Sequence, residues 1–219
     1  MNRRPSDVVM ALITLNVFLF AVAGRLHGER YDLVRQPLSR LGGLTTASGY
    51  SNNPGFWFFI VAMILSAVCS VWYARRYRDS GMPARSFLFR AGIVAALGFI
   101  LTALPFDVPE LYRIHGYGAG MAFGGFWTVG NVQLMLARRF QPGPGDTGAR
   151  ILFLILNVPF LVYSALVVLD LPVKVFAQKF AALGIAAGSY RASSRFENVW
   201  FRTDELPLGV DTVVEREVP

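Results

Sequence analysis

The chain has 219 residues, of which 54% are hydrophobic and only 16% are charged, and its mean hydropathy is +0.45. A soluble domain of this size does not have such a composition, so the chain is predicted to be a membrane protein. Its formal net charge is +7, but the basic residues gather at the ends of apolar runs. Basic residues placed there set the orientation of membrane helices, and we therefore exclude nucleic acid as a partner.

Six apolar runs follow one another along the chain. A helix needs about 20 residues to cross a bilayer, and the spans are predicted at about residues 8–24, 55–73, 86–104, 111–136, 151–169 and 173–190. The first run is slightly long for the apolar part of a signal peptide, so we interpret it as an uncleaved helix. The predicted fold is all-α, with a six-transmembrane-helix bundle in residues 1–190 and a polar cytoplasmic tail in residues 191–219.

Two connections have recognisable helix starts. The polar segment of residues 24–54 ends in Asn53-Pro54, which predicts Asn53 as an N-cap and Pro54 in the first helical position. A connection of about thirty residues inside a compact bundle usually has a function or a short structure of its own. The string Asp107-Val108-Pro109-Glu110 has the form of a capping box before the fourth span.

The orientation follows from the positions of the lysines and arginines. With six spans and both termini in the cytoplasm, the inner segments hold fourteen of them and the outer segments hold six. If the sixth run lay on the membrane surface instead, the count would be ten to ten. Because cytoplasmic loops are the more basic ones, we predict an N-in/C-in topology.

The fourth span carries a glycine at every fourth position, Gly116, Gly120 and Gly124. On a helix these residues form one stripe, where a neighbouring backbone can approach closely. The stripe predicts that the fourth helix is the central one and packs through these glycines. On this interpretation Gly120→Leu disrupts the bundle, whereas Gly143→Leu in a loop is tolerated.

A candidate catalytic set lies on the outer side in this orientation. Ser39, Asp107 and His115 have the residue types of a Ser–His–Asp triad, which needs a nucleophile, a base and an orienting acid in contact. Along a straight helix Asp107 and His115 are about 12 Å apart, so contact requires residues 105–109 to fold back over the helix mouth. The alternative is structural: Asp107 as a helix cap, Ser39 as a turn residue and His115 as an interfacial histidine with satisfied hydrogen bonds.

Four further polar residues of the outer side are predicted to bind a ligand: Arg40, Arg113, Gln178 and Lys179. Arg40 or Arg113 would bridge the acid and the histidine. Lys179 lies in the apolar part of the last run, where a charge is costly and usually faces protein or water. In the alternative interpretation, Lys179 extends its long stem to the membrane surface.

His115 has a second interpretation, as an axial ligand of haem or chlorophyll with His27 as the other ligand. The chain has only two histidines and His27 falls in a loop, so we predict no cofactor. Without a cluster of cysteines or histidines, no metal site is predicted either. Asn16, Asn131 and Asn157 are expected to form hydrogen bonds between helices rather than bind a ligand.

Several short motifs resemble those of a known family. They are Leu38-Ser39-Arg40-Leu41-Gly42 after the first span, Asn53-x-Gly55-Phe56 at the second, Asp107…His115-Gly116 at the fourth, and Gln178-Lys179 in the last helix. Together they resemble a prokaryotic six-span family, domain-of-unknown-function family 998, which is distantly similar to the eukaryotic damage-regulated autophagy modulators. The resemblance covers about residues 8–190 and implies a six-helix bundle without an established activity. This chain has Gln178 where the family leads us to expect an acidic residue.

We therefore expect a non-enzymatic bundle in the plasma membrane of a bacterium. We expect it to bind membrane lipids, another membrane protein or a second copy of itself through an outward-facing pocket between helices. The alternative is an intramembrane hydrolase or lipid-modifying enzyme that uses Ser39, Asp107 and His115. A transporter is a third class, and the lack of a clear internal repeat argues against it.

Overall fold

The computed structural model describes residues 4–79, 82, 84–140 and 147–200. These residues form the helices α1 (Pro5–Arg25), α2 (Asn53–Arg78), α3 (Arg85–Thr102), α4 (Pro109–Phe140), α5 (Thr147–Val168) and α6 (Lys174–Trp200), with the 3-10 helix η1 (Leu38–Gly42) between α1 and α2. The all-α fold predicted from the sequence is confirmed.

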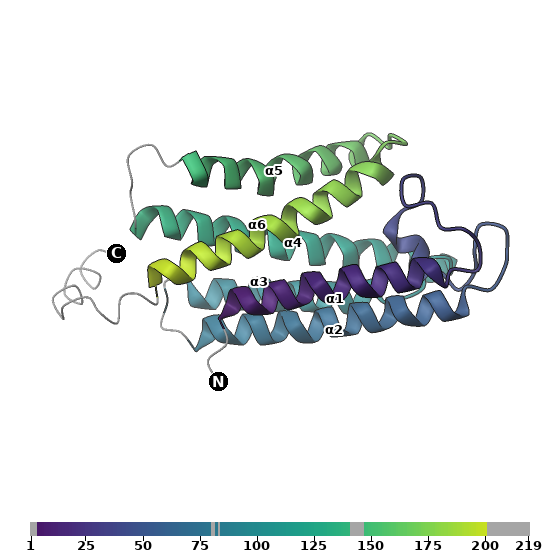
Figure 1. Ribbon diagram of the computed structural model, residues 1–219, viewed down its shortest axis with the longest axis horizontal. Helices are drawn as coiled ribbons and strands as arrows, with labels where there is room; N and C mark the ends of the chain where they lie inside the picture. The colour runs from purple at the N-terminus through teal and green to yellow at the C-terminus, as the bar shows by residue number, and fades with distance from the viewer. Residues whose placement is uncertain (1–3, 80–81, 83, 141–146, 201–219) are drawn as a thin grey trace.

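The six helices run along one axis and form an elongated bundle (Figure 1). At one end α1 begins and α2, α4 and α6 end; we call it the arginine end, because α2 and α4 carry arginines in their last turns. Residues 26–52, which we call the outer loop, lie at the opposite end, the loop end. Within the bundle, α4 packs against α3, α5 and α6.

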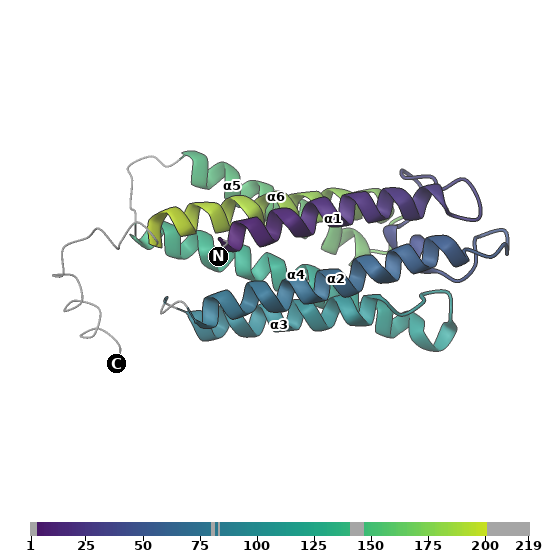
Figure 2. The same cartoon turned by 60° about the horizontal axis from the view of Figure 1, so that its bottom comes forward.

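Four of the described helices are long and apolar enough to cross a membrane, namely Ser6–Arg25, Asn53–Arg78, Arg85–Thr102 and Thr147–Val168. The other two, α4 and α6, lie alongside them (Figure 2). They are less apolar because α4 is rich in glycine and α6 carries several serines and charged residues. The count of six spans stays a prediction.

Apolar side chains cover the outside of the bundle, and several polar side chains lie inside it. On α5, Leu154 and Leu161 are 55% and 54% exposed, whereas Gln133 of α4 and Glu197 of α6 are 0% and 2% exposed. In water such a surface would be a very large apolar patch. In lipid the same surface is favourable, and polar groups belong in the interior.

The sixth helix is longer than predicted. It continues to Trp200, past the predicted end at residue 190, because Ser193, Phe196 and Glu197 are buried against other helices. The Glu197 carboxylate accepts hydrogen bonds from the Ser6 amide and, at 2.7 Å, from the Ser6 hydroxyl. That amide belongs to the first turn of α1, where amides have no partner within the helix. Residues 191–200 of the predicted tail therefore belong to the bundle, and residues 201–219 lie outside the described residues.

The second helix begins one residue earlier than predicted. Asn53 is its first residue, and Asn52, rather than Asn53, precedes it. Asn52 is fully buried, and its Nδ2 donates to the carbonyl oxygens of Leu41 at 3.1 Å and Gly43 at 2.8 Å. This side chain therefore ties the outer loop to the start of α2.

Hydrogen bonds between side chains join the helices, as predicted for the three asparagines. Asn16 Nδ2 donates to Ser66 Oγ at 2.8 Å and joins α1 to α2. Asn157 Nδ2 donates to Asn131 Oδ1 at 2.9 Å and joins α5 to α4. The predicted role of Asn16, Asn131 and Asn157 is confirmed.

A second polar cluster, which was not predicted, joins α2, α4 and α6. Tyr73 and Ser193 share a hydrogen bond of 2.8 Å between their hydroxyl oxygens. Gln133 Nε2 donates to the Tyr73 hydroxyl at 2.9 Å, and Ser193 donates to Gln133 Oε1 at 3.2 Å. All three side chains are buried. They supply one another with the hydrogen-bond partners that lipid could not provide.

Helices α3 and α4 approach each other closely. A Cβ atom added to Gly98 would lie 2.3 Å from the Ala122 amide nitrogen, and one added to Gly118 would lie 2.6 Å from the Thr102 amide nitrogen. A Cβ atom on Gly125 would lie 2.8 Å from the Ala95 Cβ. The two backbones are therefore in contact, as small residues at a membrane helix interface allow.

The predicted packing stripe is wrong. A Cβ atom added to Gly116, Gly120 or Gly124 would meet no atom within 4 Å, so these glycines face away from the neighbouring helices. The fourth helix has two rows of small residues, and the row that contains Gly118 and Gly125 is the one that packs on α3. Both rows have helical spacing, and spacing alone does not select the row that faces a neighbour. The comparison position Gly143 lies outside the described residues.

Leucine substitutions should separate the two rows. We expect Gly118→Leu to lower the stability by about 1–3 kcal/mol or more, since the added side chain must push α3 and α4 apart. Gly120→Leu, on the open row, should leave the stability unchanged. Thermal unfolding of the purified protein in detergent measures both, and equal melting temperatures for the two variants would contradict this packing.

Candidate functional site

The outer loop has a structure of its own. A backbone hydrogen bond from the Thr46 amide to the Tyr50 carbonyl oxygen closes a tight turn. The Glu29 carboxylate binds to this turn by accepting hydrogen bonds from the Ala47 amide at 3.1 Å and the Ser48 hydroxyl at 2.7 Å. Gly49 lies in that turn with φ of 82°, a conformation that favours glycine. The hydrogen bond from the Ser48 hydroxyl, with that from the Ala47 amide, favours the charged form of the Glu29 carboxylate and keeps the pKa of Glu29 below its ordinary value. The expectation that this long connection contains short structure is confirmed.

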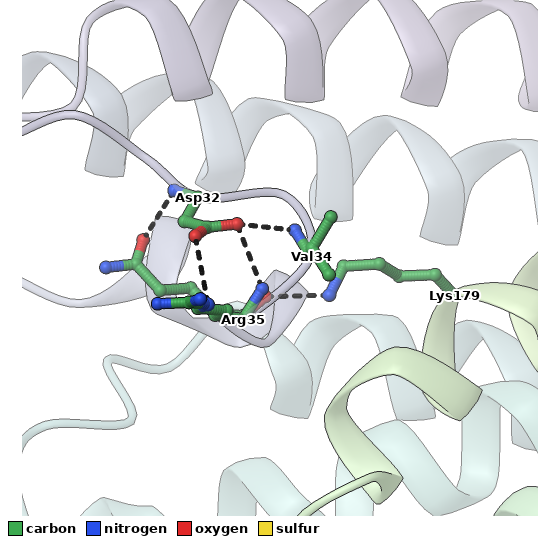
Figure 3. Close-up of polar contacts among 5 residues, drawn as sticks. Asp32, Val34, Arg35 and Lys179 are labelled. Atoms are coloured by element: carbon green, nitrogen blue, oxygen red, sulfur yellow. Dashed lines mark hydrogen bonds and ion pairs between the residues drawn. The ribbon is translucent and has the colours of Figure 1, made fainter.

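Two residues predicted to bind a ligand instead hold the outer loop on α6. Lys179 Nζ donates to the Gln36 carbonyl oxygen at 2.8 Å, and Gln178 Oε1 accepts a hydrogen bond from the Leu38 amide at 3.2 Å. The segment they hold begins with a turn closed by Asp32, whose Oδ1 accepts from the Val34 and Arg35 amides (Figure 3). Figure 3 shows Lys179 extending from α6 to this turn.

Asp107 holds the outer loop from the side of α4. Its carboxylate accepts hydrogen bonds from the Leu44 amide at 3.0 Å, the Thr45 amide at 2.8 Å and the Thr45 hydroxyl at 2.9 Å. Partial burial raises the pKa of Asp107, but these hydrogen bonds to the charged form outweigh it, and the pKa lies below its ordinary value. Asp107 is not the predicted cap of α4, which begins at Pro109.

His115 lies in a different environment from Asp107. Its Nδ1 is 2.8 Å from the Leu104 carbonyl oxygen, and its ring packs between Phe59 and Phe106 at centroid distances of 6.4 and 6.0 Å. His115 is 5% exposed. The imidazole therefore holds the end of α3 against the start of α4.

The predicted triad does not form. Among the described residues, no hydrogen bond joins Ser39, Asp107 and His115 to one another, and Ser39 lies in η1. Residues 105–109 do leave the helical path, but they turn the Asp107 carboxylate toward the outer loop while the histidine points to Leu104. Hydrogen bonds to loop amides and to a helix-end carbonyl satisfy the two groups separately, which removes the need for a shared contact.

The remaining predicted residues also have separate surroundings. The Arg40 guanidinium lies 5.6 Å from the centre of the Phe106 ring. Arg113 is exposed. His27, the second proposed haem ligand, directs its Nδ1 to the Glu29 carbonyl oxygen at 3.1 Å and packs on Tyr31, apart from the phenylalanines that enclose His115.

A pocket of about 310 Å³ opens on the side of the bundle between α3, α4 and α5. Its lining is made by Ala91, Val94, Met121, Gly124, Gly125, Trp127, Thr128 and Phe160. The wall is fixed, because the Trp127 ring lies 5.0 Å from that of Phe160 and its Nε1 donates to Asn157 Oδ1 at 3.0 Å. An apolar chain fits this lining, which contains no titratable side chain. The glycine spacing singled out Gly124 but could not predict the pocket, since α3 and α5 supply the rest of its lining.

An apolar helical bundle with polar groups turned inward defines an integral membrane protein. Residues 9–187 match the model of a family described as "Protein of unknown function (DUF998)", and the chain belongs to this family. No curated protein and no solved structure matches the chain. The family predicted from the motifs is confirmed, whereas the prokaryotic origin and the similarity to damage-regulated autophagy modulators stay predictions.

Replacing Asp107 should loosen the outer loop. We expect Asp107→Asn to speed hydrogen exchange of the Leu44 and Thr45 amides roughly ten-fold or more, since hydrogen bonds to a charged group contribute about 1.5–3 kcal/mol each. Hydrogen exchange with mass spectrometry measures this in detergent. Asp79→Asn, at the arginine end, is the control and should leave these amides unchanged.

The same amides should respond to pH. The folded pKa of Asp107 lies below the ordinary value of 3.8, so its stabilisation is present above pH 3.8 and is lost as the pH falls through the folded pKa. After correction for intrinsic rates, protection of Leu44 and Thr45 should fall below that pH in the native protein and not in Asp107→Asn. A pH response that survives in the variant would contradict the assigned anchor.

Proposed function

We propose that this protein is a non-enzymatic, lipid-binding bundle of six membrane spans, which holds an acyl chain in the pocket between α3, α4 and α5. The observation that carries the proposal is the apolar pocket of about 310 Å³ on a lipid-facing side of the bundle. Ligand pockets in proteins are mostly apolar, concave and few, and they begin near this size.

The shape of the lining favours a flexible chain over a helix of a partner protein. A helix with its side chains is about 10–12 Å wide and rigid, so only one side of it could enter the pocket and the rest would lie outside. A flexible acyl chain can enter and contact Trp127 and Phe160 directly.

The enzymatic alternative has lost its support. It needs Ser39, Asp107 and His115 in contact, and the last two bind different backbone groups. The polar residues at the loop end instead fasten the outer loop over the bundle. We therefore assign them to stability and place the binding function in the lateral pocket.

The proposal includes the topology, with the arginine end in the cytoplasm and the outer loop outside the plasma membrane of a bacterium. The excess of arginines at the ends of α2 and α4 supports it. In a Cys69→Ser background, we expect a membrane-impermeant maleimide to label Ser48→Cys on intact cells and to spare Asp79→Cys. The reverse labelling pattern would invert the topology.

The lipid site can be tested by photocrosslinking. In vesicles that contain a phosphatidylcholine with a diazirine in mid-chain, we expect crosslinks in α4 near residues 121–128 and in α5 near Phe160. Gly124→Leu should reduce these crosslinks several-fold, since its side chain enters the pocket from a position with open space around it. Mass spectrometry of the digested protein maps the crosslinked peptides.

Two controls make this test specific. Crosslinks to Ile64 and Val68, which are 50% and 59% exposed on α2, report ordinary contact with the bilayer and should not change in Gly124→Leu. Val68→Phe adds bulk at a lipid-facing position away from the pocket and should leave the pocket crosslinks intact. Uniform labelling of all apolar faces, with no effect of Gly124→Leu, would contradict a lipid site in the pocket.

A further inference from the structure

We infer that the pocket is the deep end of a track along α4 for one acyl chain of an anionic phospholipid, whose phosphate is bound by Arg113. The inference rests on the proposed function, since it names the lipid class and the residue that selects it. Its evidence is the geometry of one face of α4 and the charge at the loop end of that face.

Arg113 stands on the same face of α4 as the open glycine row. Arg113, Gly116, Gly120 and Gly124 follow one another at intervals of three or four residues, which places them in one line along a helix. None of the three glycines has an atom within 4 Å of an added Cβ. Gly124 also lines the pocket. The row therefore forms a continuous shallow path, without side chains, from Arg113 to the pocket.

The length of this path matches one leaflet of a bilayer. From Arg113 to Gly124 the helix rises about 16 Å at 1.5 Å per residue. Half of the hydrocarbon core of a bilayer is about 15 Å thick. A phospholipid with its phosphate at Arg113 would thus place the end of one chain in the pocket near the middle of the membrane.

The charge of Arg113 is available for a headgroup. In the described part of the chain Arg113 forms no ion pair, and Glu110, one turn before it, is not paired with it. Of the other cations near the start of α4, Lys174 is already paired with Asp170 and the Arg40 guanidinium lies against the Phe106 ring. A guanidinium binds phosphate oxygens through two parallel hydrogen bonds, which a free arginine at this depth is suited to form.

The exposed tyrosines beside Arg113 mark the depth of the headgroups. Tyr112 and Tyr117 are 62% and 69% exposed on the same turns of α4. Tyrosine is enriched at the boundary between headgroups and acyl chains, where its ring is in lipid and its hydroxyl is in water. Arg113 therefore lies where a lipid phosphate would lie.

An anionic lipid should be preferred over a zwitterionic one. A phosphatidylcholine carries its own cation beside the phosphate, whereas a phosphatidylglycerol leaves a net negative charge for Arg113 to neutralise. One basic residue near an anionic membrane surface changes binding by about five-fold. We expect an enrichment of that size in the pocket.

The test measures the ratio of two lipids at the same site. The full chain is placed in vesicles with equal amounts of diazirine-bearing phosphatidylglycerol and phosphatidylcholine, and the crosslinks at residues 121–128 are counted for each. The native protein should show about five-fold enrichment of phosphatidylglycerol. Arg113→Gln should bring the ratio to one with the total number of crosslinks largely kept, and Arg113→Lys should keep part of the enrichment.

Two further variants complete the experiment. Arg35→Gln removes a cation of the outer loop whose side chain is 88% exposed, and it should leave the ratio unchanged. Gly120→Leu places a side chain on the path and should lower the crosslinks in the pocket for both lipids. Full crosslinking in Gly120→Leu would mean that the chain does not run along α4.

The outcomes separate this inference from the proposed function. Pocket crosslinks without enrichment of phosphatidylglycerol, or enrichment that persists in Arg113→Gln, would overturn the inference and leave the lipid pocket in place. Absence of pocket crosslinks in the native protein would overturn the proposed function itself. Enrichment in the native protein that is lost in Arg113→Gln and kept in Arg35→Gln supports both the inference and the proposed function.

Discussion

The contact between the backbones of α3 and α4 determines how the rest of the bundle can be arranged. Gly98 and Gly118 allow the two helices to touch, and a side chain at either position would force them apart. Because one row of small residues on α4 is used in this contact, the other row faces outward. The packing of two helices thus also creates the path that leads to the pocket.

The apolar surroundings of the bundle explain where its polar groups lie. Lipid offers no hydrogen-bond partners, so a buried polar group is stabilised by a partner inside the protein. Glu197 satisfies an amide at the start of α1, and Gln133 and Tyr73 satisfy each other between α4 and α2. At the loop end, Asp107 and Lys179 bind backbone groups of the outer loop and thereby fix its path over the bundle.

The candidate site was predicted only in part. The motifs led to the correct family, and the asparagines were correctly assigned to helix contacts. The hydrogen-bond partners of Asp107 and His115 were not predicted correctly, because a carboxylate that can orient a histidine can equally accept hydrogen bonds from loop amides. Which of these it does depends on the path of residues 26–52, and sequence spacing carries no information about a path between distant segments.

The sequence by itself determined the class of the protein. Apolar runs of membrane length, with charged residues between them, predict an all-α bundle. These features are local, because each helix has them independently of its neighbours. The tertiary structure alone decided which glycine row packs, how far α6 extends and where the pocket lies. Each of these depends on close contact between residues far apart in the chain, which hydrophobic periodicity does not specify.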